Sequence, residues 1–229
     1  MDAVVAANES LVSELAALNS AVSTCRSCRL AETRTQAVFG SGDPDAELMF
    51  VGEAPGFHED QQGLPFVGAA GKLLERLLGE IGLTRDEVFI GNVLKCRPPG
   101  NRDPLADEIE ACQVHLFRQI ELIQPRVVAT LGNFATKLLS GDPTGITRVH
   151  GRERDVRLGQ TRVLLYPIYH PAAALYTQAM LRVLEEDFRR LPELLGRQQA
   201  PVNSVEAVPE PLHSEELAAE EAERQLGLF

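Results

Sequence analysis

Four short, almost wholly apolar runs are spread through the middle of the chain, and they constrain its fold more than any other feature. The runs cover residues 47–53, 87–93, 126–131 and 163–168. Apolar runs of this length are typical of strands that are buried on both faces. Helical patterns of apolar residues lie between and after them, at residues 70–81, 104–123, 133–139 and about 172–195.

Strands that alternate with helices of this length predict βαβ crossovers and a parallel sheet. We therefore expect an α/β protein, a three-layer α/β/α sandwich with a central four-stranded, mainly parallel sheet. Its functional cleft should lie beyond the carboxyl ends of the strands.

The two ends of the chain differ from this central part. Leu11, Leu15, Leu18 and Val22 recur at helical spacing, so residues 1–24 should form an amphipathic helix that packs on the domain. The domain itself should span residues 25–197. Beyond it, residues 198–229 alternate proline with Glu and Ala, which is typical of an acidic, disordered tail.

The formal net charge is −11, which excludes a uniformly basic surface. Most of this charge lies at the ends, because residues 200–229 hold seven Glu and one Arg, and residues 1–24 hold three acidic and no basic side chains. The remaining residues 25–199 carry about −2. A site for a polyanion must therefore be local.

The first residues lack the basic segment of a signal peptide, and no apolar run approaches the roughly 18 residues of a membrane span. We expect a cytoplasmic protein without membrane contact, in which disulfides are rare. Cys25 and Cys28 form a CxxC pair, and Cys96 and Cys112 follow after gaps of 67 and 15 residues. Four thiolates suit tetrahedral zinc or a [4Fe–4S] cluster, and their spacing does not choose between the two. The alternative is four buried free cysteines.

Short motifs follow three of the predicted strands. GEAPG occupies residues 52–56, with GLPFVG at 63–68; NVLKCRPPGNR occupies 92–102; HPAA occupies 170–173. Because the carboxyl ends of parallel strands share one edge, these motifs offer a carboxylate, an amide and an imidazole to one cleft.

In order and spacing these motifs, together with the four cysteines, resemble the uracil-DNA glycosylase superfamily, and most closely its iron–sulfur branch, family 4. The resemblance covers about residues 20–195. It implies a [4Fe–4S] cluster on Cys25, Cys28, Cys96 and Cys112, and an enzyme that flips uracil out of single- or double-stranded DNA and hydrolyses its N-glycosidic bond.

The resemblance also implies roles for individual residues. Phe66 would stack on the flipped base, Asn92 would bind its Watson–Crick edge, and His170 would donate a hydrogen bond to the departing pyrimidine anion. Better-known members carry aspartate followed by Pro-Tyr where this chain has Ala54-Pro55-Gly56. The catalytic water would therefore be held by the Ala54 backbone with help from Glu53 or Asn101, and Glu59 would replace the missing tyrosine wall.

Basic residues near these motifs are candidates for contacts with DNA phosphates. They are Lys95, Arg97, Arg102, Arg148, His150 and Arg152. For residues 152–162 the alternative is a solvated charged hairpin.

The favoured function is a monofunctional DNA glycosylase, which we expect to be a monomer. One alternative is a glycosylase with a broader range of deaminated bases, because Gly56 leaves its position open. The other is a non-catalytic iron–sulfur DNA-binding module that retains the fold.

The last five residues, QLGLF, resemble the peptide by which bacterial repair proteins bind the DNA polymerase sliding clamp. The candidate clamp-binding residues are Gln225, Leu226, Leu228 and Phe229. The alternative is a frayed amphipathic helix at residues 214–226 whose last residues pack on the domain.

Overall fold

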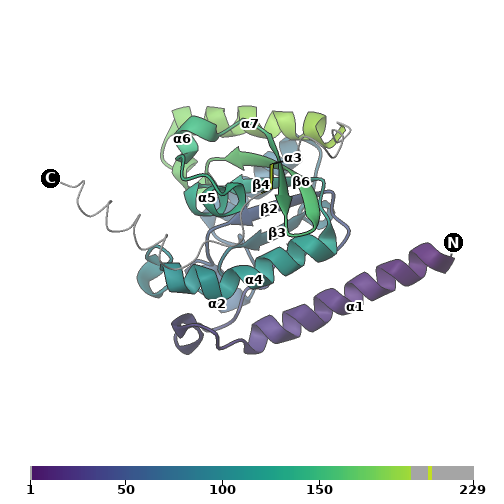
Figure 1. Ribbon diagram of the computed structural model, residues 1–229. Coiled ribbons are helices and arrows are strands. Elements are labelled where there is room, and N and C mark those ends of the chain that lie inside the picture. The colour runs from purple at the N-terminus through teal and green to yellow at the C-terminus, as the bar shows by residue number, and fades with distance from the viewer. Residues whose placement is uncertain (1, 197–205, 208–229) are drawn as a thin grey trace.

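The computed structural model describes residues 2–196 and 206–207. Within these residues one mixed sheet lies between two groups of helices (Figure 1). Its strands are β1 (Ser41–Gly42), β2 (Leu48–Gly52), β3 (Phe89–Asn92), β4 (Val127–Leu131), β5 (Arg154–Leu158), β6 (Thr161–Ile168) and β7 (Glu206–Ala207). The helices are α1 (Asp2–Thr24), α2 (Phe57–Gln62), α3 (Ala69–Glu80), α4 (Ala106–Ile123), α5 (Asn133–Ser140), α6 (Ile146–Val149) and α7 (Gln178–Gly196).

The four predicted strands are confirmed, and they form the parallel centre of the sheet in the order β3-β2-β4-β6. All residues of β2, β3 and β4 are buried, as the apolar runs indicated. In the register of β2 and β3, Gly52 lies beside Asn92. The motifs that follow these strands therefore begin at one edge of the sheet.

The predicted number of strands was too low, because the sheet has seven within the described residues. β1 pairs antiparallel with β3, and β5 pairs antiparallel with β6 as the first strand of a charged hairpin. β5 was not predicted because buried and more exposed residues alternate along it, so it has no continuous apolar run. β7 pairs with β5, so Glu206 and Ala207 belong to a strand, although they lie in the segment predicted to be disordered. The rest of that segment lies outside the described residues.

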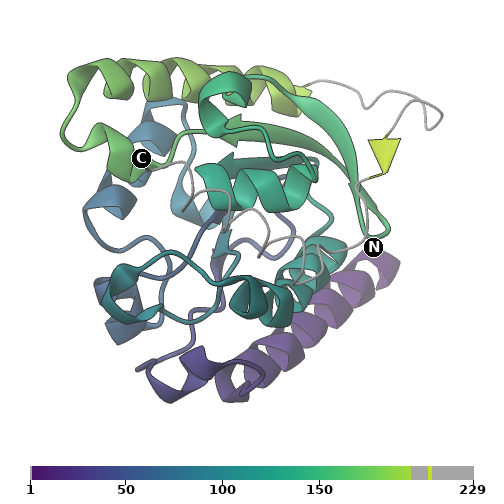
Figure 2. The same cartoon turned by 60° about the vertical axis from the view of Figure 1, so that its left-hand side comes forward.

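Two apolar layers hold the helices on the sheet and confirm the three-layer sandwich (Figure 2). On one face, Met49 and Val128 pack with leucines and isoleucines of α4 and α5. On the other face, Phe50 and Tyr166 pack with leucines of α3 and α7.

Helix α1 lies along the outside of α4 (Figure 1). Its residues Leu15 and Val22 are buried, and Glu14 pairs with Arg118 of α4 at 2.8 Å. This packing places the following CxxC pair next to α4. No described helix is long and apolar enough to cross a membrane.

Candidate active site and cysteine cavity

The side chains predicted to handle a base come together above the end of β2. The rings of Phe66 and His170 stack with centroids 5.6 Å apart and planes 28° apart. A Cβ on Gly52 would overlap Asn92 Oδ1 and would lie 2.8 Å from Phe66 Cζ. Gly52 thus lets an amide, a phenyl ring and an imidazole converge on one small space.

Asn92 is 2% exposed, and its Oδ1 has no hydrogen-bond partner among the described residues. A buried amide oxygen without a partner costs free energy, so native proteins rarely retain one without a reason. An N–H group of a ligand would satisfy this acceptor.

The backbone around Phe66 is held in an uncommon conformation. Phe66 has φ of 53°, in the left-handed region that only a few per cent of non-glycine residues adopt. Arg85 donates to the carbonyls of Phe66 and Pro65 at 2.9 and 2.7 Å, and a Cβ on Gly71 would overlap the Phe66 carbonyl. The ring is therefore positioned before any ligand arrives.

His170 is arranged as a neutral hydrogen-bond donor. Its Nδ1 accepts from the backbone N–H of Ala172 at 3.2 Å, so Nε2 carries the ring proton. Burial lowers the pKa of His170 to about 4, against the opposing effect of Glu59. The imidazole is consequently uncharged at neutral pH.

Two of the three residues assigned to water, Glu53 and Ala54, directly follow β2. Burial raises the pKa of Glu53 to about 7, and the nearby Asp103 adds to the effect. Ala54 packs against the apolar core. Asn101 is exposed and its Oδ1 accepts from Arg97 Nε at 2.6 Å, so that oxygen is already engaged.

The Glu59 carboxylate lies between two segments of the site, the one around Gly56 and the one at Val67 and Gly68. Its Oε1 accepts from the backbone N–H groups of Val67 and Gly68, both at 2.9 Å. Its Oε2 would lie 2.7 Å from a Cβ on Gly56. Gly56 has no side chain, and the sequence therefore indicated an open space at this position. The Glu59 carboxylate fills that space.

The prediction that Lys95 contacts phosphate was wrong, because its side chain folds back under β3 and is 1% exposed. Arg102 is engaged with Glu108 in a bidentate pair at 2.6 and 2.8 Å. Arg97 lies over the ring of Phe57, 5.1 Å from its centroid.

The remaining candidate phosphate contacts lie in and after α6. Arg148 and Arg152 are exposed. The half-buried His150 lies 3.3 Å from Asp187 Oδ2, and its ring contacts that of Tyr169, next to His170, in a tilted arrangement with centroids 4.6 Å apart. His150 therefore lies close to the segment that carries His170.

Sequence reasoning missed two exposed apolar side chains just beyond His170. Leu175 is 36% exposed and Tyr176 is 92% exposed. Their position after the HPAA motif was a signal, but exposure cannot be read from a loop sequence.

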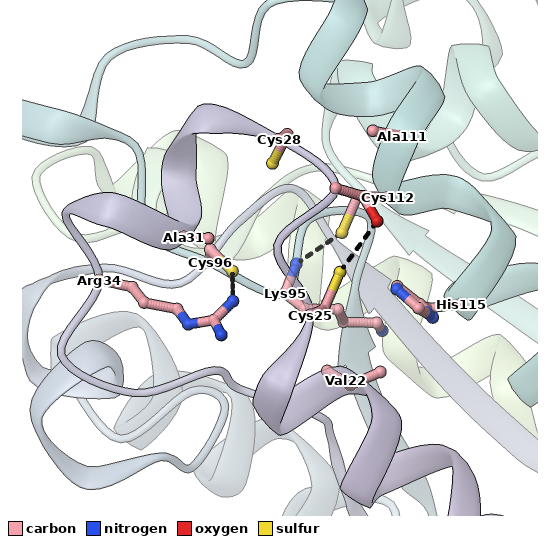
Figure 3. Close-up of a pocket in the computed structure, with 11 residues that line it drawn as sticks. Val22, Cys25, Cys28, Ala31, Arg34, Lys95, Cys96, Ala111, Cys112 and His115 are labelled. Atoms are coloured by element: carbon pink, nitrogen blue, oxygen red, sulfur yellow. Dashed lines mark hydrogen bonds between the residues drawn. The ribbon is translucent and has the colours of Figure 1, made fainter.

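All four cysteines line one cavity, well separated in sequence but adjacent in space (Figure 3). Cys25 follows α1, Cys28 precedes a 3₁₀ turn, Cys96 follows β3 and Cys112 belongs to α4. His115 of α4, which the sequence did not single out, lies on the same cavity, and its buried Nε2 has no described partner.

Hydrogen-bond donors reach two of the sulfurs. Arg34 donates to Cys96 Sγ at 3.0 Å, and the backbone N–H of Lys95 donates to Cys112 Sγ at 3.2 Å. Such donors stabilise thiolates that bind a metal. Without a metal, burial raises the pKa of Cys112 to about 12, with Lys95 acting in the opposite direction.

The spread of the sulfurs tests which metal group fits. Four thiolates on one zinc ion lie about 3.8 Å from one another, given Zn–S bonds of about 2.3 Å. Among the described residues, no three Cys, His, Asp or Glu side chains are gathered closely enough for a single ion. Four sulfurs that line one cavity provide the number of thiolate ligands that an iron–sulfur cluster needs.

The fold and the site together define an α/β protein in which a buried, unpaired amide oxygen and two stacked rings meet at the strand ends, with a separate four-cysteine cavity. Residues 39–191 match the family model of the Uracil DNA glycosylase superfamily. A type-4 uracil-DNA glycosylase of Sulfurisphaera tokodaii is 51% identical over 178 residues, which cover 76% of this chain and 81% of that protein. One from Archaeoglobus fulgidus is 47% identical over 182 residues, or 78% of this chain and 92% of that protein. The chain belongs to the uracil-DNA glycosylase superfamily and, within it, to the type-4 enzymes.

Proposed function

We propose that the protein is a monofunctional uracil-DNA glycosylase that flips uracil out of DNA, hydrolyses its N-glycosidic bond and leaves an abasic site. The observation that carries this proposal is the unpaired Oδ1 of Asn92 beside the stacked rings of Phe66 and His170. A uracil ring offers an N3–H group to such an acceptor and a flat face to such a ring.

Base release needs stabilisation of the pyrimidine anion that departs from C1′ of the sugar. The Nε2–H of His170 is the donor for the developing charge on uracil O2. A neutral imidazole suits this role because its N–H···O hydrogen bond becomes stronger as negative charge develops on uracil O2. It carries no second ring proton that would first have to be lost to solvent.

Water attacks C1′ as the bond to uracil breaks, and its proton must be taken up. Glu53, with a pKa of about 7, is suited to orient this water and accept that proton, with the Ala54 backbone as a second contact. Asn101 is the less favoured alternative because its oxygen is engaged by Arg97.

Release of uracil from oligonucleotides tests the whole proposal. Free uracil should appear from U·G pairs, U·A pairs or single strands, with an alkali-labile abasic site and no strand break. Binding without release from all three substrates would instead support the non-catalytic module.

Glu59 should determine which bases the enzyme can accept and release. Its carboxylate covers Gly56, so the space that would favour a broader range is reduced. Release of other deaminated bases, measured beside uracil, decides between the narrow and the broad specificity.

Tyr176→Ala should lower release from duplex DNA by about 10-fold and leave release from single strands nearly unchanged. Apolar wedges help to unstack a base from a duplex, and Tyr176 is exposed beside the motif that carries His170. Single-turnover rates on matched duplex and single-stranded substrates provide the measurement. An equal loss on both substrates would contradict a role in extrusion.

For the cysteine cavity we propose a [4Fe–4S] cluster on Cys25, Cys28, Cys96 and Cys112. When bound, it would join the start of the domain to β3 and α4 as a structural crosslink. Anaerobically purified protein should be brown and hold about four irons per chain, the iron content of one such cluster. Stoichiometric zinc without iron, measured by metal analysis, would show the assignment to be wrong.

The clamp-binding residues lie outside the described part of the chain, and clamp binding remains a proposal, as do the monomeric state and the cytoplasmic location. The three apolar side chains of the last five residues would act as anchors on an acidic tether, which raises the local concentration of the enzyme at the clamp. A labelled peptide of residues 214–229 should bind a bacterial clamp. Binding that persists unchanged after Leu228 and Phe229 become Ala would contradict these anchors.

A further inference from the structure

Lys95 has an unusual environment for a lysine. It is 1% exposed, and its Nζ donates to the carbonyl of Asn92 at 2.8 Å and to Gln119 Oε1 at 2.6 Å. Both acceptors are neutral. A buried ammonium normally requires a counter-charge, because its transfer from water is costly.

No carboxylate forms an ion pair with Lys95 among the described residues. The sulfurs of Cys112 and Cys96 are the anionic groups that act on it when they are thiolates. Its backbone N–H also donates to Cys112 Sγ (Figure 3). A metal centre with four thiolates would supply the negative charge that this cavity wall otherwise lacks.

The same lysine also contacts the residue proposed to recognise the base. The Asn92 carbonyl that it holds belongs to the residue whose side chain presents the unpaired Oδ1. Gln119 lies two turns beyond Cys112 on α4, and its Nε2 donates to the carbonyl of Phe39 at 2.9 Å. Lys95 is thus fixed between the end of β3 and α4, where it lines the cysteine cavity and also contacts Asn92.

We infer that Lys95 is a positioning residue that couples the metal–thiolate centre to base recognition. The thiolate charge keeps the ammonium in place, and the ammonium holds the backbone of Asn92 so that its amide meets the edge of uracil. This inference rests on the proposed function and on the proposed cluster, and it adds a role in recognition to the structural role of the cluster.

Lys95→Met tests the inference in protein loaded with iron, with iron content measured for every variant. Lys72→Met is the matched control, because it removes the same charge from an exposed site on α3. The first readout is affinity for an oligonucleotide with 2′-fluorodeoxyuridine, which resists hydrolysis. Lys95→Met should weaken binding by about 10-fold, the effect of losing one charged hydrogen bond, and Lys72→Met should not.

The second readout is the reduction potential of the cluster. Removal of a buried cation beside two ligand cysteines should make the potential more negative, whereas the exposed control should leave it unchanged. This shift would show that the Lys95 ammonium acts on the cluster, while the affinity readout reports its action on Asn92.

A double-mutant cycle links the effect to Asn92. In an Asn92→Ala background, Lys95→Met should cause no further loss of affinity, but the shift in potential should persist. A full additional loss of affinity, or an unchanged affinity and potential in the single variant, would overturn the inference.

If Lys95→Met fails to load iron, Gln119→Leu provides the test, since it removes one of the two acceptors of Nζ and leaves the charge. It should weaken binding of the same oligonucleotide in the native background and have no effect in the Asn92→Ala background; the same loss in both would contradict the coupling. Failure of the native protein to release uracil would refute the proposed function separately, because it would be seen without any Lys95 variant.

Discussion

His170→Ala should lower the rate of uracil release on the order of 100-fold or more, with little change in DNA affinity. In the proposed mechanism the imidazole stabilises charge that exists mainly in the transition state, so its loss should affect the chemical step more than binding. Single-turnover kinetics and equilibrium binding on one substrate separate the two effects. Full activity in this variant would show that the site is wrongly assigned.

The pH profile offers a check on the same residue. With a pKa of about 4, His170 should stay neutral from pH 5 to 8, so its protonation should not limit the native rate there. A loss of activity between pH 6 and 7 that disappears in His170→Ala would contradict a neutral donor.

Gly52→Ala should reduce uracil release by roughly 100-fold although it removes no reactive group. The added methyl group would overlap Asn92 Oδ1 and crowd Phe66, so neither could keep its place on the base. The loss should appear in the affinity for uracil-containing DNA as well as in the rate, because recognition itself is disturbed.

Gly79→Ala is the matched control for this substitution. Gly79 lies in α3 with nothing within 4 Å of an added Cβ, so alanine should raise stability by about 0.4–1 kcal/mol and leave activity unchanged. Thermal unfolding and release assays on both variants distinguish a local effect in the pocket from a general effect on folding. Equal activity of the two variants would contradict the close approach at Gly52.

The parallel centre of the sheet could be predicted because its strands are buried on both faces and so consist of apolar residues throughout. The outer strands could not be predicted from the sequence. β1 and β7 are two residues long, and β5 carries charged residues on its exposed positions. Helix α2 has only six residues, too few for an apolar stripe to be recognised.

The convergence of Phe66, Asn92 and His170 could be predicted from motifs at strand ends, since topology alone places those ends together. The contacts around these three residues could not be predicted, because they depend on the conformations of long side chains. The sequence predicts that Lys95 is a surface cation beside a motif, yet its side chain folds back onto the Asn92 carbonyl. The clamping of the Phe66 backbone by Arg85, nineteen residues away, has no local signature.

The path of α1 along the outside of α4 has a consequence for synthesis of the protein. Cys25 and Cys28 precede Cys112 by more than eighty residues, so a ribosome needs roughly 4–17 seconds to supply the last thiol after the first two. During that interval α1 has no α4 to pack against, and the CxxC pair has no complete site. Two neighbouring thiols left free for seconds can oxidise to a disulfide. For the proposed cluster, the yield of correctly assembled protein should therefore depend on reducing conditions around the nascent chain as much as on the supply of metal.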